Sequence, residues 1–260
     1  MSRQFIEVER DGHVTKITLN RPEVMNAVHS PMHFELDEVL GDFAADSEQW
    51  VAIVTGAGDR AFSAGNDLKW QAGGGEMRSP PSGFAGLTSR FDLDKPLIAA
   101  VNGVAMGGGF EIALACDLII AAERAIFALP EPRVGLAALA GGLHRLPRTI
   151  GLKRAMGMIL TGRRVSAREG RELGFVNEVS ANQDLMAAAR QWADLICECS
   201  PMSIRASKAA VLRGLDEPSL AAAIKGQNRY EAVAALFRSE DFIEGPRAFA
   251  AKRAPQWKGR

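Results

Sequence analysis

Short β-type segments alternate with helical ones along the first 182 residues, and this alternation limits the possible folds more than any other feature. Three of the β-type segments are almost wholly apolar runs, at residues 51–55 (VAIVT), 97–101 (LIAAV) and 118–122 (LIIAA). The first ends at Gly56 and the second at Asn102-Gly103, which are turn-forming residues. Because helices between strands allow those strands to run in the same direction, the alternation predicts an α/β core with much parallel pairing.

Two signals near the start of the chain predict a hairpin and a helix. Asp11-Gly12 separates residues 6–9 from residues 14–20, and a pair of this type between two β-type runs forms a hairpin turn. Ser30-Pro31 predicts a helix with Ser30 as its N-cap and proline in its first turn. The residues that this helix should bury recur at helical spacing: Met32, Leu36, Val39, Leu40 and Phe43.

The second half of the chain becomes helical. Short strands are still expected at residues 125–129 and 175–179, and Ser166 with Glu169 forms a capping box ahead of a short helix. From about Asn182 to the end, helices are expected to begin near Leu185, Ser200, Pro218 and Ser239. Residues 72–86 are rich in glycine, proline and serine, and they predict a mobile surface loop.

Composition excludes several classes of protein. The 260 residues are 47% hydrophobic and 24% charged, a balance that builds a core without disulfides or metals. Lys plus Arg and Asp plus Glu both number 31, and this neutrality argues against a nucleic-acid partner. The three cysteines form no disulfide framework and suit a reducing compartment. No apolar run reaches the ~18 residues of a membrane span and no secretion signal is visible, so we expect a cytoplasmic protein without a membrane partner.

The densest chemical signal is the segment at residues 101–117 (VNGVAMGGGFEIALACD). Its three consecutive glycines, at 107–109, follow a strand and open a helix, where bare N–H groups make a partial positive charge that suits an anion. Glycine also lets a ligand approach the main chain closely. From the residues alone, two plainer interpretations stay open: a tight turn without a ligand, and a Glu111 that only complements the helix dipole.

Two further segments place polar groups next to turns. Residues 62–69 (FSAGNDLK) lead from a strand into a short helix, with the Asn66 amide near the start of that helix. Two turns of this kind could direct two backbone donors at one oxygen, which is the geometry of an oxyanion hole. Glu131 lies between Pro130 and Pro132, which fix its backbone, although an isolated glutamate in such a loop is more often simply solvated.

Taken together, the order and spacing of these segments resemble the crotonase family, the enoyl-CoA hydratase/isomerase superfamily. The matching segments are residues 20–28 (NRPEVMNAV), FSAGNDLK, VNGVAMGGGFEIALACD and residues 129–135 (LPEPRVG). The resemblance covers nearly the whole chain and implies a spiral of ββα units with a C-terminal helical region. On this basis we expect a catalytic core at residues 1–182 and a helical region at residues 183–260. The resemblance also implies self-association as a homotrimer or a dimer of trimers.

The resemblance assigns roles to four residues. The amides of Asn66 and Gly108 correspond to the oxyanion-hole donors, which hold the thioester carbonyl as it becomes an enolate. Glu111 and Glu131 match the two acid/base carboxylates of the hydratase branch, which adds water to, or removes it from, a 2-enoyl-CoA. Glu111 would take a proton from the water that attacks C3, and Glu131 would deliver a proton to C2. No cofactor is expected, because coenzyme A enters as part of the substrate.

Other activities of the same fold stay open. Double-bond isomerases of the family commonly keep only the second glutamate, so the presence of both favours hydration over isomerisation, and some relatives hydrolyse thioesters. This chain departs from the family pattern at Ala138-Leu139, where hydratases usually have Pro-Gly, and at Asn66, where they more often have alanine. The first departure leaves the preferred acyl group open, including carnitinyl-, feruloyl- and ordinary enoyl-CoA.

The resemblance also implies contacts with the acyl-CoA thioester. The residues in question are Val24, Asn26 and Ala27, Ala64, Asp67, Leu68 and Lys69, and, toward the nucleotide of a neighbouring subunit, Phe249 and Lys252. Residues 244–260 contain five basic residues and one acid, which suits phosphates but also suits a solvated helix end. Glu23 stands where the family often has lysine, and this substitution should weaken that contact.

Four alternative interpretations of the sequence have weaker support. Gly56-x-Gly58 after a strand resembles part of a dinucleotide-binding fingerprint, but the following helix and the acidic residue after a second strand are missing. His29 and His33 stand four residues apart without a third ligand, so no metal is expected. Ser63 lies in no GxSxG elbow. A scaffold that binds acyl-CoA without catalysis would need neither Glu111 nor Glu131.

Overall fold

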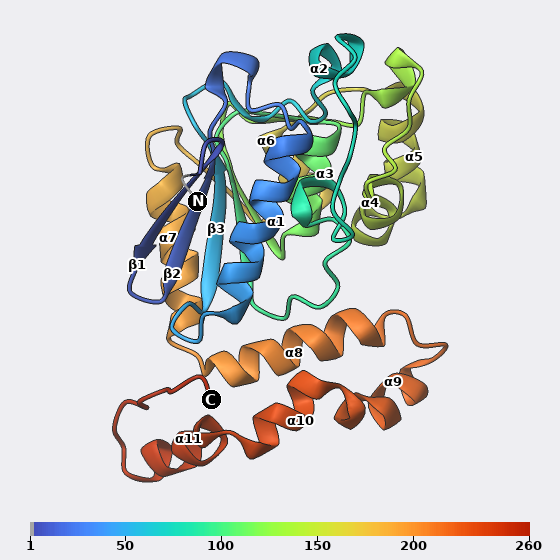
Figure 1. The fold of residues 1–260 in the computed structure, drawn as a ribbon. Helices are drawn as coiled ribbons and strands as arrows, with labels where there is room; N and C mark the ends of the chain where they lie inside the picture. The colour runs from blue at the N-terminus through green and yellow to red at the C-terminus, as the bar shows by residue number, and fades with distance from the viewer. Residues whose placement is uncertain (1–2) are drawn as a thin grey trace.

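Two sheets organise the computed structural model, which describes residues 3–260 (Figure 1). The six-stranded sheet has the order β1 (Ile6–Asp11), β2 (Val14–Leu19), β3 (Val51–Gly56), β5 (Leu97–Val101), β7 (Leu118–Ala122), β10 (Glu178–Ser180). Within this sheet only the pair β1–β2 is antiparallel, which confirms the predicted hairpin and the parallel pairing. The smaller sheet has the order β4 (Ala61–Ser63), β6 (Val104–Met106), β8 (Ile126–Ala128), β9 (Val165–Ser166).

Consecutive strands alternate between the two sheets. β3, β5 and β7 lie in the large sheet, whereas β4, β6 and β8, which follow them directly in the chain, pair in the small one. A helix follows two of these pairs, namely α2 (Leu68–Ala72) after β4 and α3 (Gly108–Ala115) after β6. The unit of two strands and a helix therefore repeats in space, as the predicted spiral of ββα units requires, although no repeat is visible in the sequence.

The large sheet is covered on both faces, which explains its uninterrupted apolar strands. Ala52 and Ala99 face the main core, together with α1 (Ser30–Ala45) and α3. The adjacent Ile53 and Ile98 face α7 (Leu185–Cys197) on the other side of the sheet. In the main core Phe110, Phe127 and Phe175 pack with ring centroids 5.1–5.2 Å apart. The five predicted apolar residues of α1 are all buried.

The C-terminal part is helical, as predicted. Its helices are α8 (Pro201–Gly214), α9 (Leu220–Gly226), η4 (Gln227–Arg229), α10 (Glu231–Arg238) and α11 (Glu240–Ala250), and in Figure 1 they form a separate layer at the lower side of the molecule. After β8 the chain forms η3 (Glu131–Val134), α4 (Gly142–Ile150) and α5 (Leu152–Thr161), and α6 (Ala167–Leu173) follows between β9 and β10. Within residues 3–260 no helix is both long and apolar enough to cross a membrane.

Three local predictions need correction. Ser30 is not an N-cap, because His29 occupies the cap position and the Ser30 hydroxyl bonds the backbone of Glu76 and Arg78 instead. The predicted surface loop at 72–86 ends in η2 (Phe84–Gly86), whose Ala85 is 1% exposed. The strand predicted at 175–179 begins only at Glu178, since the preceding residues complete the end of α6 and pack into the core.

Candidate active site

The turn at residues 64–67 is fastened to the segment that follows η1 (Pro22–Val24). Val28 N–H donates to Gly65 O at 2.8 Å, and Asp67 N–H donates to Val28 O at 3.0 Å. In this parallel bridge the N–H of Asn66 points away from Val28. Among residues 3–260 it has no hydrogen-bond acceptor, so it is a free donor beside the turn.

The first turn of α3 supplies a second free donor. Gly108 is the first residue of α3, so its N–H has no acceptor inside the helix, and it finds none elsewhere in the described chain. Gly65 lies directly against it, since a Cβ on Gly65 would be 2.8 Å from Gly108 N. The two turns that sequence analysis singled out are therefore in contact, and their free N–H groups can share an anionic oxygen.

Glu111 is buried one turn further along α3. Its side chain is enclosed, with the residue 3% exposed, and its Oε1 accepts a hydrogen bond from Gly142 N–H at 2.9 Å. Burial raises the pKa of Glu111 to about 7, and the nearby charge of Glu131 adds to this, while the N–H groups of Gly142 and Ala140 and the charge of Arg145 act in the opposite direction. The backbone just after Ala138-Leu139 thus donates hydrogen bonds to this carboxyl group.

Glu131 approaches the same helix start from the other side. It begins η3 (Glu131–Val134), and a Cβ on Gly107 would lie only 2.7 Å from its Oε1. Its Oε2 is buried and has no hydrogen-bond partner within residues 3–260. Burial raises the pKa of this carboxyl group as well. A buried carboxylate oxygen without a partner is costly in an ordinary core, and it is typical of a site that receives a ligand.

The four groups form one constellation around the start of α3. Two free backbone donors lie at Asn66 and Gly108, and two carboxyl groups lie at Glu111 and Glu131, where the charge of Glu131 helps to raise the pKa of Glu111. When two carboxyl groups interact in a water-poor site, one tends to hold a proton while the other is ionised. This arrangement can stabilise negative charge on an oxygen and can move protons beside it.

Several residues that were predicted to contact the ligand stabilise the segments beside these four groups. Asn26 is fully buried, and its side chain accepts from Arg21 N–H and donates to the carbonyls of Ala57 and Ala61. Asp67 caps α2 and pairs with Arg21 at 2.9 Å. Val24, Ala27, Ala64, Leu68 and Lys69 lie on the same two segments. Their contact with a ligand stays a prediction.

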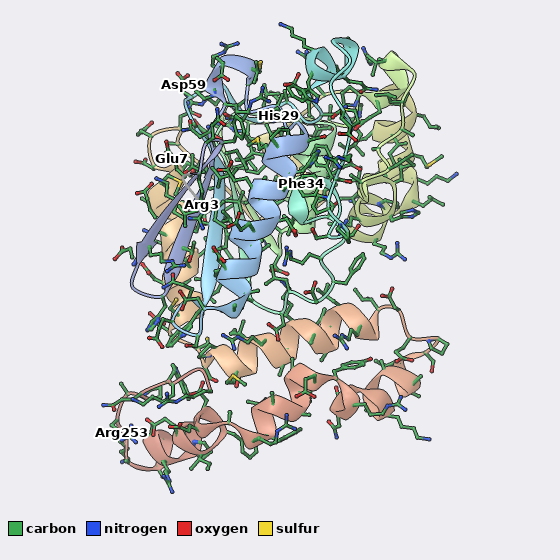
Figure 2. The ribbon with its side chains drawn as sticks, viewed as in Figure 1. Arg3, Glu7, His29, Phe34, Asp59 and Arg253 are labelled. Atoms are coloured by element: carbon green, nitrogen blue, oxygen red, sulfur yellow. The ribbon has the colours of Figure 1, made fainter. Side chains whose placement is uncertain are left out.

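Phe249 and Lys252 do not join this site within one chain. Both belong to the end of α11 and the turn after it, and Phe249 is 87% exposed. In Figure 2 the neighbouring Arg253 and His29, at the start of α1, mark opposite ends of the molecule. The approach of Phe249 and Lys252 to the nucleotide of a neighbouring subunit therefore stays a prediction.

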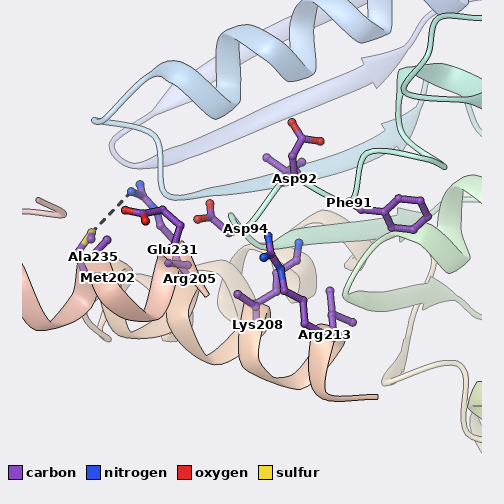
Figure 3. Close-up of a pocket in the computed structure, with 13 residues that line it drawn as sticks. Phe91, Asp92, Asp94, Met202, Arg205, Lys208, Arg213, Glu231 and Ala235 are labelled. Carbon is purple, nitrogen blue, oxygen red and sulfur yellow. Dashed lines mark hydrogen bonds between the residues drawn. The ribbon is translucent and has the colours of Figure 1, made fainter. Parts of the chain in front are cut away.

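A separate cavity of about 290 Å³, whose lining includes none of these four groups, lies between residues 91–94 and the helices α8 and α10 (Figure 3). Its charged lining includes Arg205, Lys208 and Glu231.

His29 and His33, the candidate metal pair, are both buried, and His33 Nδ1 accepts a hydrogen bond from Ala85 N–H. Within residues 3–260 no three metal-binding side chains gather at one point.

Two residues that touch the site were not predicted from the sequence. Gly142 holds Glu111, and the Gly141-Gly142 pair ahead of a helix was a visible signal for it. Phe84 lies against Gly108, since a Cβ on Gly108 would be 2.5 Å from Phe84 Cζ. Nothing in the sequence around Phe84 indicated this position.

Glu111 should make the stability of the protein depend on pH. Its folded pKa of about 7 exceeds the ordinary value of 4.5, so between these values the folded chain binds more protons, and the free energy of unfolding falls as pH rises. Glu111→Gln keeps an oxygen for Gly142 N–H but carries no charge. We expect this variant to have a higher Tm than the native protein near pH 8 and a similar Tm near pH 4.5, measured by calorimetry. A lower Tm near pH 8 would contradict the raised pKa.

Comparison with known proteins gives consistent matches over almost the whole chain. A family model described as enoyl-CoA hydratase/isomerase matches residues 9–260. Carnitinyl-CoA dehydratases from Salmonella typhi and Citrobacter koseri are 44% and 45% identical, each over 99% of both chains. A crystal structure of enoyl-CoA hydratase from Mycobacterium tuberculosis H37Rv superposes with a TM-score of 0.92 at 37% identity, over 98% of this chain and 99% of that one. An enoyl-CoA hydratase from Mycobacterium marinum gives 0.92 at 38% identity, with the same coverage.

Proposed function

The chain belongs to the enoyl-CoA hydratase/isomerase family and is a hydro-lyase of the enoyl-CoA hydratase type, and from this premise we propose how its residues move water across C2–C3 of a 2-enoyl-CoA thioester. The observation that carries the proposal is the buried Glu111 carboxyl group and the Glu131 carboxyl group, whose Oε2 is buried, beside two free backbone donors. Enzymes of this family need no cofactor, and coenzyme A enters as part of the substrate.

In the hydration direction, the thioester oxygen receives hydrogen bonds from the N–H groups of Asn66 and Gly108. Glu111 in its ionised form, which dominates above its pKa of about 7, takes one proton from the attacking water as the oxygen of that water bonds to C3. The carbonyl oxygen then gains the negative charge of an enolate. Protonated Glu131 then gives its proton to C2, and the carbonyl re-forms. The proton on Glu111 leaves through solvent, and Glu131 is reprotonated. Dehydration runs through the same steps in reverse.

The relatives suggest which substrate to test first. Proteins named carnitinyl-CoA dehydratase are 43–45% identical to this chain over its full length. We therefore infer that a 3-hydroxyacyl-CoA of the carnitinyl type, and its dehydrated 2-enoyl product, belong in the substrate panel beside crotonyl-CoA and longer enoyl-CoA thioesters. The Phe249 and Lys252 positions would meet the nucleotide of such a thioester only in an oligomer, so a homotrimer or dimer of trimers is part of the proposal.

Spectroscopy of purified protein tests the reaction class. Addition of water removes the conjugated enoyl thioester, so the ultraviolet absorbance of a 2-enoyl-CoA should fall, and carnitinyl-CoA should generate such absorbance by dehydration. A hydrolase would instead release the free thiol of coenzyme A, and an isomerase would convert a 3-enoyl-CoA without taking up water. Either of these results, without hydration of any 2-enoyl-CoA, would contradict the proposal.

A further inference from the structure

The short helix η2 is packed between α1 and the start of α3. Its first residue, Phe84, lies with its ring edge on Gly108, because a Cβ on Gly108 would be 2.5 Å from Phe84 Cζ and 2.7 Å from Cε1. Phe84 itself is only half-buried, whereas Ala85 and Gly86 behind it are buried. The ring therefore stands beside Gly108, the residue that carries the free N–H, and part of the Phe84 side chain stays exposed.

The backbone that carries Phe84 is strained. Ala85 has φ +56°, a left-handed conformation that costs a non-glycine residue roughly 1–2 kcal/mol. The strain is held by His33 on α1, whose Nδ1 accepts a hydrogen bond from Ala85 N–H at 2.7 Å. The same imidazole packs edge-on against the Phe84 ring, with centroids 4.5 Å apart and planes at 77°. One side chain thus fixes both the backbone behind Phe84 and the orientation of its ring.

The chemistry of this contact requires a neutral imidazole. Only an unprotonated Nδ1 can accept from Ala85 N–H, and burial lowers the pKa of His33 to about 4, with the nearby His29 adding to the effect. Other bonds of this loop act elsewhere: Asp37 binds Ser82 and Arg90, and Arg90 also binds Gly86 O. The N–H groups of Gly86 and Leu87 also close the turn by donating to the carbonyls of Gly83 and Phe84, while the N–H of Ala85 donates to His33.

We propose that His33 is a positioning residue that fixes the Phe84 ring as a wall of the acyl site, and that this wall limits the bulk of the acyl group accepted beside Gly108. The inference rests on the proposed function in one respect, since it places the acyl thioester at the Gly108 amide. It adds a determinant of acyl specificity on α1, a helix that contributes no group to the proton transfers.

Three variants test the wall. His33→Phe keeps a ring but removes the acceptor, His33→Asn keeps an acceptor oxygen near the place of Nδ1, and Phe84→Ala removes the wall itself. The readout is the ratio of kcat/KM for a branched or long 2-enoyl-CoA to that for crotonyl-CoA. We expect Phe84→Ala and His33→Phe to raise this ratio by about tenfold or more, the size typical of a changed apolar pocket, and His33→Asn to keep it near the native value. His33→Leu is the second acceptor-free variant if His33→Phe does not fold.

A merely structural role for His33 predicts a different result. Loss of stability alone would lower kcat/KM for both substrates by a common factor and leave the ratio unchanged, and that outcome would overturn the proposal. The double variant His33→Phe/Phe84→Ala should have the ratio of Phe84→Ala alone, because both changes remove the same wall. Calorimetry on butyryl-CoA and a bulkier saturated acyl-CoA gives a corresponding ratio of Kd values without turnover. They separate a failure of the wall from a failure of the proposed reaction.

Discussion

Glu131→Gln is expected to lower kcat for hydration of a 2-enoyl-CoA by about 10²–10⁴-fold, with little change in the affinity for a saturated acyl-CoA. The substitution keeps the size of a side chain whose Oε1 lies against Gly107, so the start of α3 should not move. What it removes is the proton that Glu131 gives to C2. Initial rates on crotonyl-CoA and calorimetric binding of butyryl-CoA measure the two effects separately.

Glu111→Gln should have an effect of similar size by a different route. The amide cannot accept the proton of the attacking water, although its oxygen can still accept from Gly142 N–H. The two losses should not add fully in the double variant, because both residues serve one proton relay. Glu123→Gln is the matched control, since Glu123 is exposed and, within residues 3–260, its carboxylate pairs only with the surface Arg168. A single variant with native kcat would remove that glutamate from the mechanism.

Much of the fold could be predicted from the chain because its strands are distinct. The runs at 51–55, 97–101 and 118–122 are apolar on both faces, and they became the three central strands of a sheet that is covered on both sides. The alternation between two sheets could not be read in the same way. It depends on the short strands β4, β6 and β8, whose three residues carry too little pattern to show which partner they pair with.

The limits at the site have a similar cause. Gly65, Gly107 and Gly108 were visible as glycines, and their close contacts explain why they are needed. Phe84 was not visible, because its position follows from a left-handed alanine, and alanine gives no signal for that conformation. The prediction of Ser30 as an N-cap was wrong for another reason. A serine hydroxyl can bond either a helix end or a neighbouring loop, and here it bonds the loop at Glu76 and Arg78.

Gly65→Ala is also expected to have a large effect, about 10²–10³-fold on kcat, the loss that follows removal of one oxyanion donor. A Cβ on Gly65 would lie 2.5 Å from Met106 O and 2.8 Å from Gly108 N. Both are backbone atoms next to the start of α3, so the turn or the helix must shift. Either shift separates the N–H groups of Asn66 and Gly108, which must converge on one oxygen.

Gly174→Ala separates this effect from simple backbone strain. Gly174 has φ +100° and Gly65 has φ +85°, so both variants carry the cost of a left-handed alanine, roughly 1–2 kcal/mol. A Cβ on Gly174, however, meets nothing within 4 Å in the described chain. We expect both variants to lose Tm through this strain, and Gly65→Ala to lose more because its Cβ also meets backbone atoms, but only Gly65→Ala to lose kcat. Equal kcat in the two variants would show that the contact between the turn at 64–67 and α3 does not align the oxyanion donors, and the mechanism would then have to find its electrostatic stabilisation elsewhere.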